Sequence, residues 1–185
     1  MNFLAVIDQV TSRLDAADIR YALIGGFAMA LRGVQRATVD LDFILMLDDL
    51  NHADAIFREA GYTRAFRNEN VSHYISKDTE LGRIDILHAF RGPTLSMLDR
   101  ADRLPIDDRL SLPVVQMEDI IGLKIQSARN DPSRSETDWQ DIHAIIAAAS
   151  EARKEPDWRL LKDYLDIFRQ TDKLQTLKNW YGPTH

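Results

Sequence analysis

Cysteine is absent from this sequence of 185 residues, which removes several kinds of protein from consideration. Without thiols there is no disulfide framework, no thiolate nucleophile and no cysteine-ligated zinc site. No apolar run approaches the ~20 residues that a membrane-spanning helix needs. The N-terminal segment lacks a basic start and reaches Asp8 too early for a secretory signal peptide. We therefore expect a cytoplasmic protein with no membrane part.

Positive charge is also scarce, since 23 Lys and Arg stand against 29 Asp and Glu and give a formal net charge of −6. Proteins that coat nucleic acid by bulk electrostatics need a clustered excess of basic residues, so this balance argues against that mode of binding. Hydrophobic residues at 45% and charged residues at 28% are ordinary for a globular protein. The length suits one domain, or one domain with a helical appendage.

The most informative segment runs from residue 21 to residue 47. It predicts a buried strand at Ile19–Ile24 and a turn at Gly25-Gly26 that opens a short helix at Phe27–Gly33. A second strand is predicted at Thr38–Leu45. Side chains two apart on a strand point to the same face. If the second strand already begins near Arg36, its polar face carries Arg36, Thr38, Asp40 and Asp42, and its apolar face carries Val39, Leu41 and Phe43.

A pair of carboxylates on this strand points to a cation. Asp40 and Asp42 repel each other when both are ionised, unless a cation lies between them. A third carboxylate, Asp85, is flanked by isoleucines in a later predicted strand, Gly82–Leu87, where it shares a face with Arg83. A carboxylate this deep in an apolar strand needs a partner. We expect that partner to be a metal ion shared by the three aspartates.

The remaining elements complete an α/β (α+β) fold. We expect helices at Phe3–Ala17, Leu50–Ala60 and Pro93–Leu104. We expect strands at Thr63–Arg67, Val71–Lys77 and Leu110–Val115. Helices follow at Met117–Ile125, Asp138–Ala149, Trp158–Phe168 and Lys173–Trp180. The pattern predicts a mixed twisted sheet of four or five strands flanked by helices over residues 1–115, and a helical C-terminal subdomain over residues 116–185.

These residues carry a resemblance to a known family. Gly25-Gly26, the Asp40-x-Asp42 pair and the distant hydrophobic-Asp-hydrophobic of Asp85 resemble the nucleotidyltransferase superfamily of the DNA polymerase β type. The string GGFAMALRGVQRATVDLDFIL resembles its AbiEii-like bacterial branch, which includes toxins of toxin–antitoxin pairs. The segment VVQMEDIIGLKIQSARNDPSRSETDWQDIHAI is similar to the same branch, so the resemblance covers roughly residues 20 to 145.

The resemblance implies transfer of a nucleoside monophosphate from a nucleoside triphosphate to the 3′ end of a transfer RNA or to a protein hydroxyl, with release of pyrophosphate. Asp40 and Asp42 would hold the Mg²⁺ that carries the triphosphate, and Asp85 would help to bind a second Mg²⁺ and activate the acceptor. Carboxylate and phosphate oxygens are the ligands that Mg²⁺ prefers, and two ions can stabilise the attacking and leaving oxygens. A toxin role and a cognate antitoxin are implied in the same way.

The resemblance also implies nucleotide-binding residues, which are Gly25, Gly26, Arg36, Thr38, Lys124 and Asp138. Many relatives have Ser where this chain has Gly26, so one phosphate contact is missing or supplied elsewhere.

Several of these residues have an ordinary structural interpretation too. Arg36 could equally close a surface salt bridge, and strand propensity alone explains Thr38. Lys124 could extend from an apolar helix to solvent. Asp138 could belong to the capped first turn of a helix, with Asp141 one turn on as the alternative site residue.

Two other functions stay open at this point. The chain could be a non-catalytic member of the fold that binds a nucleotide or a partner protein. It could also be a structural protein in which the three aspartates face solvent or pair with Arg36 and Arg83. His73 and His88 lie in predicted strands near the proposed cleft, but isolated histidines are usually structural, so neither is included in the candidate site.

Overall fold

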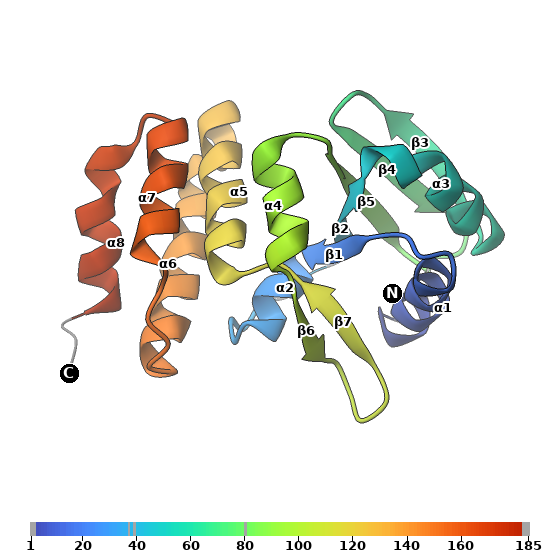
Figure 1. Cartoon of the computed structure of the whole chain (residues 1–185), viewed down its shortest axis with the longest axis horizontal. Coiled ribbons are helices and arrows are strands. Elements are labelled where there is room, and N and C mark those ends of the chain that lie inside the picture. The colour runs from blue at the N-terminus through green and yellow to red at the C-terminus, as the bar shows by residue number, and fades with distance from the viewer. Residues whose placement is uncertain (1–2, 37, 39, 80, 183–185) are drawn as a thin grey trace. The chain divides into compact units, whose positions relative to one another are not determined.

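The computed structural model describes residues 3–36, 38, 40–79 and 81–182, and Val39, which we placed on the apolar strand face, lies outside these residues. The chain divides into two compact units (Figure 1). Unit 1 comprises residues 1–28 and 36–115, and unit 2 comprises residues 29–35 and 116–185. The division falls within the short helix α2 (Gly25–Leu31).

Unit 1 is built on a mixed sheet with the strand order β3-β4-β5-β2-β1-β7-β6. The strands are β1 (Tyr21–Ile24), β2 (Asp40–Met46), β3 (Tyr62–Arg67), β4 (Val71–Ser76), β5 (Arg83–Ala89), β6 (Asp102–Pro105) and β7 (Ser111–Val114). β2 runs parallel to β5, and β1 runs parallel to β7 and antiparallel to β2. The mixed α/β architecture expected from the sequence is therefore present, with β2 and β5 side by side inside the sheet.

The prediction of four or five strands was wrong, because the described sheet has seven. The helix expected over Pro93–Leu104 ends early: α4 spans Gly92–Arg100, and β6 follows as an antiparallel partner of β7. Most of β6 is exposed at the sheet edge. An exposed edge strand shows no apolar alternation, so its sequence cannot be distinguished from the end of a helix.

One face of this sheet is apolar and covered by helices α1 (Phe3–Ala16) and α3 (Leu50–Glu59) (Figure 1). Phe57 of α3 packs against Tyr74 of β4 with ring centroids 4.7 Å apart. The Tyr74 hydroxyl donates to Asp54 Oδ1 at 3.1 Å, and burial, with a smaller contribution from Asp54, raises the pKa of Tyr74 to about 12. These contacts leave the polar side chains of β2 and β5 on the opposite face.

Strand β2 begins later than expected. It starts at Asp40, so Arg36 and Thr38 precede the strand, and alternation within it cannot place them beside Asp40 and Asp42. That part of the prediction was wrong. Where a strand begins depends on its pairing with neighbouring strands. Alternation within residues 36–43 carries no information about that pairing.

Unit 2 is helical. It contains α5 (Met117–Asn130), α6 (Ser135–Glu151), α7 (Trp158–Ile167) and α8 (Leu174–Tyr181), which pack as a bundle (Figure 1). α5 and α7 approach closely at Gly122, where an added Cβ would lie 2.7 Å from the Tyr164 ring. Across the described ranges, we find no helix with the length and apolar character needed to cross a membrane.

Candidate active site

Three carboxylates lie on one face of the sheet in unit 1. Asp42 of β2 stands directly opposite Asp85 of β5 in the parallel register, and Asp40 stands opposite Arg83. Residues paired across neighbouring strands point to the same side of a sheet. The structure therefore brings Asp40, Asp42 and Asp85 together on one face, although 45 residues separate the first from the last along the chain.

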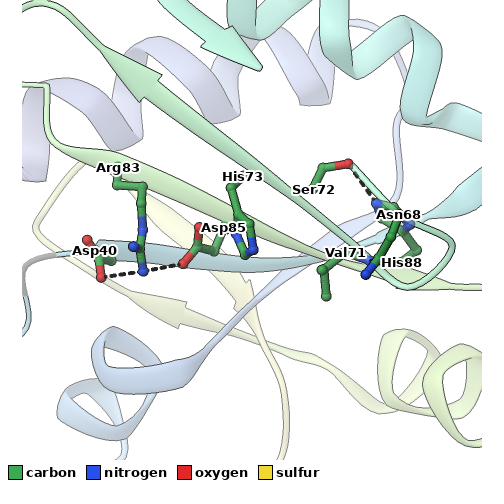
Figure 2. Close-up of polar contacts among 8 residues, drawn as sticks. All are labelled: Asp40, Asn68, Val71, Ser72, His73, Arg83, Asp85 and His88. Atoms are coloured by element: carbon green, nitrogen blue, oxygen red, sulfur yellow. Dashed lines mark hydrogen bonds and ion pairs between the residues drawn. The ribbon is translucent and has the colours of Figure 1, made fainter. Parts of the chain in front are cut away.

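Arg83 lies between two of these carboxylates (Figure 2). Its Nη2 donates to Asp40 Oδ2 at 3.0 Å and to Asp85 Oδ2 at 2.7 Å. The Arg83 side chain is 48% exposed, whereas Asp40 and Asp85 are 28% and 18% exposed. The cationic partner that we expected to be a metal ion is, in this structure, a guanidinium.

His73 is a site residue that the sequence analysis left out. Its Nδ1 lies 2.7 Å from Asp85 Oδ1, and β4 pairs it directly with Asp85 (Figure 2). The opposite neighbour of His73 is Phe66 of the edge strand β3, whose ring stacks on the imidazole with centroids 5.4 Å apart and an interplanar angle of 24°. Asp85 is thus held from two sides, by His73 and by Arg83.

A β-bulge places Phe66 beside this site. Arg64 pairs with Tyr74, but the register shifts before Phe66, which pairs with His73. Simple alternation would put Phe66 on the same face as Arg64, which bonds to Asp54 of α3. The bulge moves the phenyl ring to the other face, where it is 47% exposed. Phe66, His73, Asp85 and Asp42 therefore form one row across four strands.

Gly25 packs against Asp42, and Gly26 packs against Thr38. Gly25 has φ +65°, and a Cβ at this position would lie 2.1 Å from Asp42 Oδ2. A Cβ at Gly26 would lie 3.0 Å from Thr38 Oγ1, and this hydroxyl donates to the Asp40 carbonyl at 3.1 Å. The missing side chains at both positions make room for the residues around Asp42. Arg36, four residues before Asp40, has an exposed side chain.

Lys124 and Asp138 are brought together as well, in unit 2. Lys124 Nζ lies 2.9 Å from Asp138 Oδ1 and 2.6 Å from Asp141 Oδ2. The Lys124 side chain is 12% exposed and that of Asp138 is 1% exposed. The alternatives weighed for this segment, Asp138 or Asp141, therefore both hold the same ammonium. Arg134 Nε also lies 3.9 Å from Asp138 Oδ2, so the two carboxylates, the ammonium and this guanidinium together carry no formal net charge.

The donor chemistry of Asp40, Asp42 and Asp85 fits Mg²⁺, because three carboxylates from adjacent strands supply hard oxygen ligands. Within the ranges that the structure describes, however, no group of three or more His, Cys, Asp or Glu side chains is assembled closely enough to hold a metal ion. The hydrogen bonds from Arg83 take one oxygen of Asp40 and one of Asp85. The three carboxylates are the ligand type of a magnesium site, but the Arg83 side chain lies between two of them.

Similarity to known proteins agrees with this geometry. The sequence profile of the aminoglycoside-2″-adenylyltransferase family matches residues 6–92, slightly less than half of the chain but a segment that includes all three aspartates. No curated protein sequence matches the chain.

We compare three solved structures that are similar to this chain. The antibiotic-resistance factor ANT(2″)-Ia has 15% identity and a TM-score of 0.67 over 97% of both chains. A Thermotoga maritima protein described as a nucleotidyltransferase has 15% identity and a TM-score of 0.58 over 75% of this chain and 92% of its own.

The lincosamide antibiotic adenylyltransferase LnuA, solved with lincomycin bound, has 17% identity and a TM-score of 0.56 over 76% of this chain and 94% of its own. The fold of this chain is that of the nucleotidyltransferases.

Proposed function

We propose that the chain is an Mg²⁺-dependent nucleotidyltransferase that moves a nucleoside monophosphate from a nucleoside triphosphate to a hydroxyl group. The observation that carries the proposal is the parallel register that sets Asp42 opposite Asp85, with Asp40 on the same face, in a chain with this fold. The profile match over residues 6–92 favours ATP as the nucleotide, since the matching family is one of adenylyltransferases.

Asp40, Asp42 and Asp85 would hold the metal. When bound, Mg²⁺ would supply charge neutralisation to the triphosphate and to the reacting oxygens. Asp85, held by His73, would accept the proton of the acceptor hydroxyl. The acceptor oxygen then forms a bond to the α-phosphorus, the bond from that phosphorus to the bridging oxygen breaks, and pyrophosphate leaves.

The nucleotide side of the site is assigned to the residues that the family resemblance implies. Gly25 and Gly26 offer backbone amides without side chains, and Thr38 and Arg36 precede the aspartates on the same segment. Lys124 has three N–H donors, and Asp138 and Asp141 account for two of them. A third donor would therefore remain for a phosphate oxygen, with Asp138 holding the ammonium in position.

A hydroxyl-bearing small molecule is the acceptor class that the comparisons favour, because the profile match is to an aminoglycoside adenylyltransferase family and LnuA was solved with lincomycin. The AbiEii-like string favours a transfer RNA 3′ end or a protein hydroxyl instead, and with it a toxin function and an antitoxin partner. These acceptors are distinguished by one assay.

The test is to incubate the protein with Mg²⁺ and each α-labelled nucleoside triphosphate, together with an aminoglycoside and lincosamide panel, total RNA or total protein. We expect label in one acceptor class and release of pyrophosphate. Asp42→Asn should reduce transfer by at least about 100-fold, since it removes a charge at the reacting centre. Asp48→Asn, on the exposed turn after β2, is the matched control and should keep full transfer. Nucleotide binding without transfer to any acceptor would show a binding protein instead.

A further inference from the structure

The position of Arg83 bears on how the three aspartates exist without a metal ion. A guanidinium stays protonated in proteins and places its donors in a rigid plane. One nitrogen of Arg83 bonds to Asp40 and to Asp85 (Figure 2). The register places Asp42 on the same face. The three carboxylates and Arg83 together carry a formal charge of −2, which equals in magnitude the charge of one divalent cation.

Arg83 bonds to one oxygen of each of two candidate metal ligands. Asp40 Oδ2 and Asp85 Oδ2 each accept a hydrogen bond from Arg83 Nη2. An oxygen lone pair that accepts this hydrogen bond is not available to a cation along the same direction, and two positive charges repel each other at such a separation. Among the described residues no closed metal-ligand cluster is present, as expected while Arg83 lies between the ligands.

We propose that Arg83 is an internal counter-ion of the site, which holds Asp40 and Asp85 in the metal-free protein and is displaced when a divalent cation binds. The inference rests on the proposed function, because it takes the three aspartates to be metal ligands. Displacement requires no rearrangement of the fold, since the Arg83 side chain is half-exposed and can turn toward solvent. Two consequences follow: Arg83 weakens the binding of a divalent cation, and it stabilises the metal-free protein by neutralising repulsion between carboxylates.

The first test measures metal affinity rather than activity. Mn²⁺ is titrated into the full chain without nucleotide, and binding is followed by calorimetry and by the loss of the free Mn²⁺ electron paramagnetic resonance signal. Arg83→Gln should bind Mn²⁺ about tenfold more tightly than the unmodified protein, a moderate factor because water screens a half-exposed charge. Arg83→Lys keeps the positive charge and should stay close to the unmodified protein.

Arg91→Gln provides the matched control. Arg91 is also an exposed arginine of unit 1, paired with Glu69 at 3.5 Å, and it follows the end of β5 at Ala89. Arg91→Gln removes the same formal charge as Arg83→Gln. A general electrostatic effect on Mn²⁺ affinity would therefore appear in both variants, whereas an effect of the position of Arg83 would appear in Arg83→Gln alone.

Thermal unfolding supplies a second readout. Without metal, Arg83→Gln should unfold at a lower temperature than the unmodified protein, and saturating Mg²⁺ should narrow this difference. Equal or weaker Mn²⁺ binding by Arg83→Gln, with clear binding by the unmodified protein, would overturn the role of Arg83 and leave the proposed function intact. If neither protein bound Mn²⁺ or Mg²⁺, with or without nucleotide, the metal site itself would be refuted and the inference with it.

Discussion

Gly25 and the carboxylate of Asp42 occupy adjoining space, so closely that a single methyl group at Gly25 would overlap Asp42 Oδ2 at 2.1 Å. The φ of +65° at Gly25 independently disfavours any residue with a side chain. The glycine that the sequence analysis assigned to phosphate approach therefore has a second role, which is to let Asp42 lie against the backbone at the start of α2.

Replacing Gly25 with alanine should destabilise unit 1 and displace Asp42. A left-handed conformation costs an alanine about 1–2 kcal/mol, and the overlap with the carboxylate adds to this, so we expect a loss of more than about 2 kcal/mol in the free energy of unfolding. Urea denaturation measures it. Gly92→Ala is the control, because an added Cβ there meets no atom within 4 Å. Similar losses in both variants would contradict the role of the Asp42 contact.

The buried His88 predicts a dependence of stability on pH. His88 is 1% exposed, and its Nε2 lies 2.9 Å from Ser72 Oγ (Figure 2). Its Nδ1 lies 3.0 Å from the Glu69 carbonyl. Burial lowers the pKa of His88 below its ordinary value, and Arg67 adds a smaller effect of the same sign. Folding therefore favours the neutral ring, and this contribution to stability is present above the unfolded-state pKa and is lost as the pH falls below it.

We expect the free energy of unfolding to fall when the pH is lowered from about 7.5 to about 5, and to fall less in His88→Gln. At the higher pH the variant itself should lose about 1–3 kcal/mol, the cost of unsatisfied buried partners. Urea unfolding at both pH values measures the two slopes. Equal slopes for the two proteins would exclude His88 as the titrating group. His52→Gln, on the exposed side of α3, controls for the loss of a histidine.

The sequence was sufficient to predict the apolar strands and the aspartate face. Period-two alternation placed Asp42 correctly with Asp40, and Asp85 with Arg83, because each pair lies inside a single strand. It could not show that His73 touches Asp85, since that contact depends on the register between β4 and β5. The bulge that turns Phe66 toward His73 leaves no signal in composition, so the sheet edge of the site was missed.

The same limit applies to charge partners. From the sequence, Arg83 was expected to pair with the aspartates only if the chain had a structural role, whereas in the structure it bonds to two of them in the candidate site. For Lys124 the helical pattern showed an amphipathic position but not a partner. Asp138 and Asp141 lie on another helix, and only packing of α5 on α6 brings their carboxylates to the ammonium.

Removing the charge of Lys124 should destabilise unit 2. Lys124→Met removes the ammonium that Asp138 and Asp141 share, and breaking a buried ion pair from one side costs up to roughly 3–5 kcal/mol. Arg134, 3.9 Å from Asp138 Oδ2, should offset part of that cost. The double variant Lys124→Met/Asp138→Asn should recover part of the loss, since it removes one of the two carboxylates that face the missing ammonium. Denaturation of single and double variants measures this coupling. Lys162→Met, at an exposed pair with Asp166, should change stability little.

Replacing Gly122 with alanine should lower stability, which is the opposite of the usual effect of this substitution in a helix. Glycine within a helix normally gains about 1 kcal/mol of stability when replaced by alanine. Here an added Cβ would lie 2.7 Å from ring atoms of Tyr164, whose hydroxyl donates to the buried Asp119 at 2.7 Å. The ring is rigid and tied at its far end, so it cannot move aside without straining that hydrogen bond. Gly122→Ala should therefore destabilise unit 2 by about 1–3 kcal/mol, the usual cost of overpacking.

Pairing the same change with Tyr164→Leu separates the two effects. The smaller side chain leaves room for the Cβ, so adding Gly122→Ala to Tyr164→Leu should cost less than adding it to the unmodified protein, and helix propensity should offset part of what remains. A double-mutant cycle from urea denaturation gives the coupling energy directly. A coupling energy near zero would mean that the Tyr164 ring can move away from the added Cβ without loss of stability. The absence of a side chain at Gly122 would then not be what allows α5 and α7 to approach.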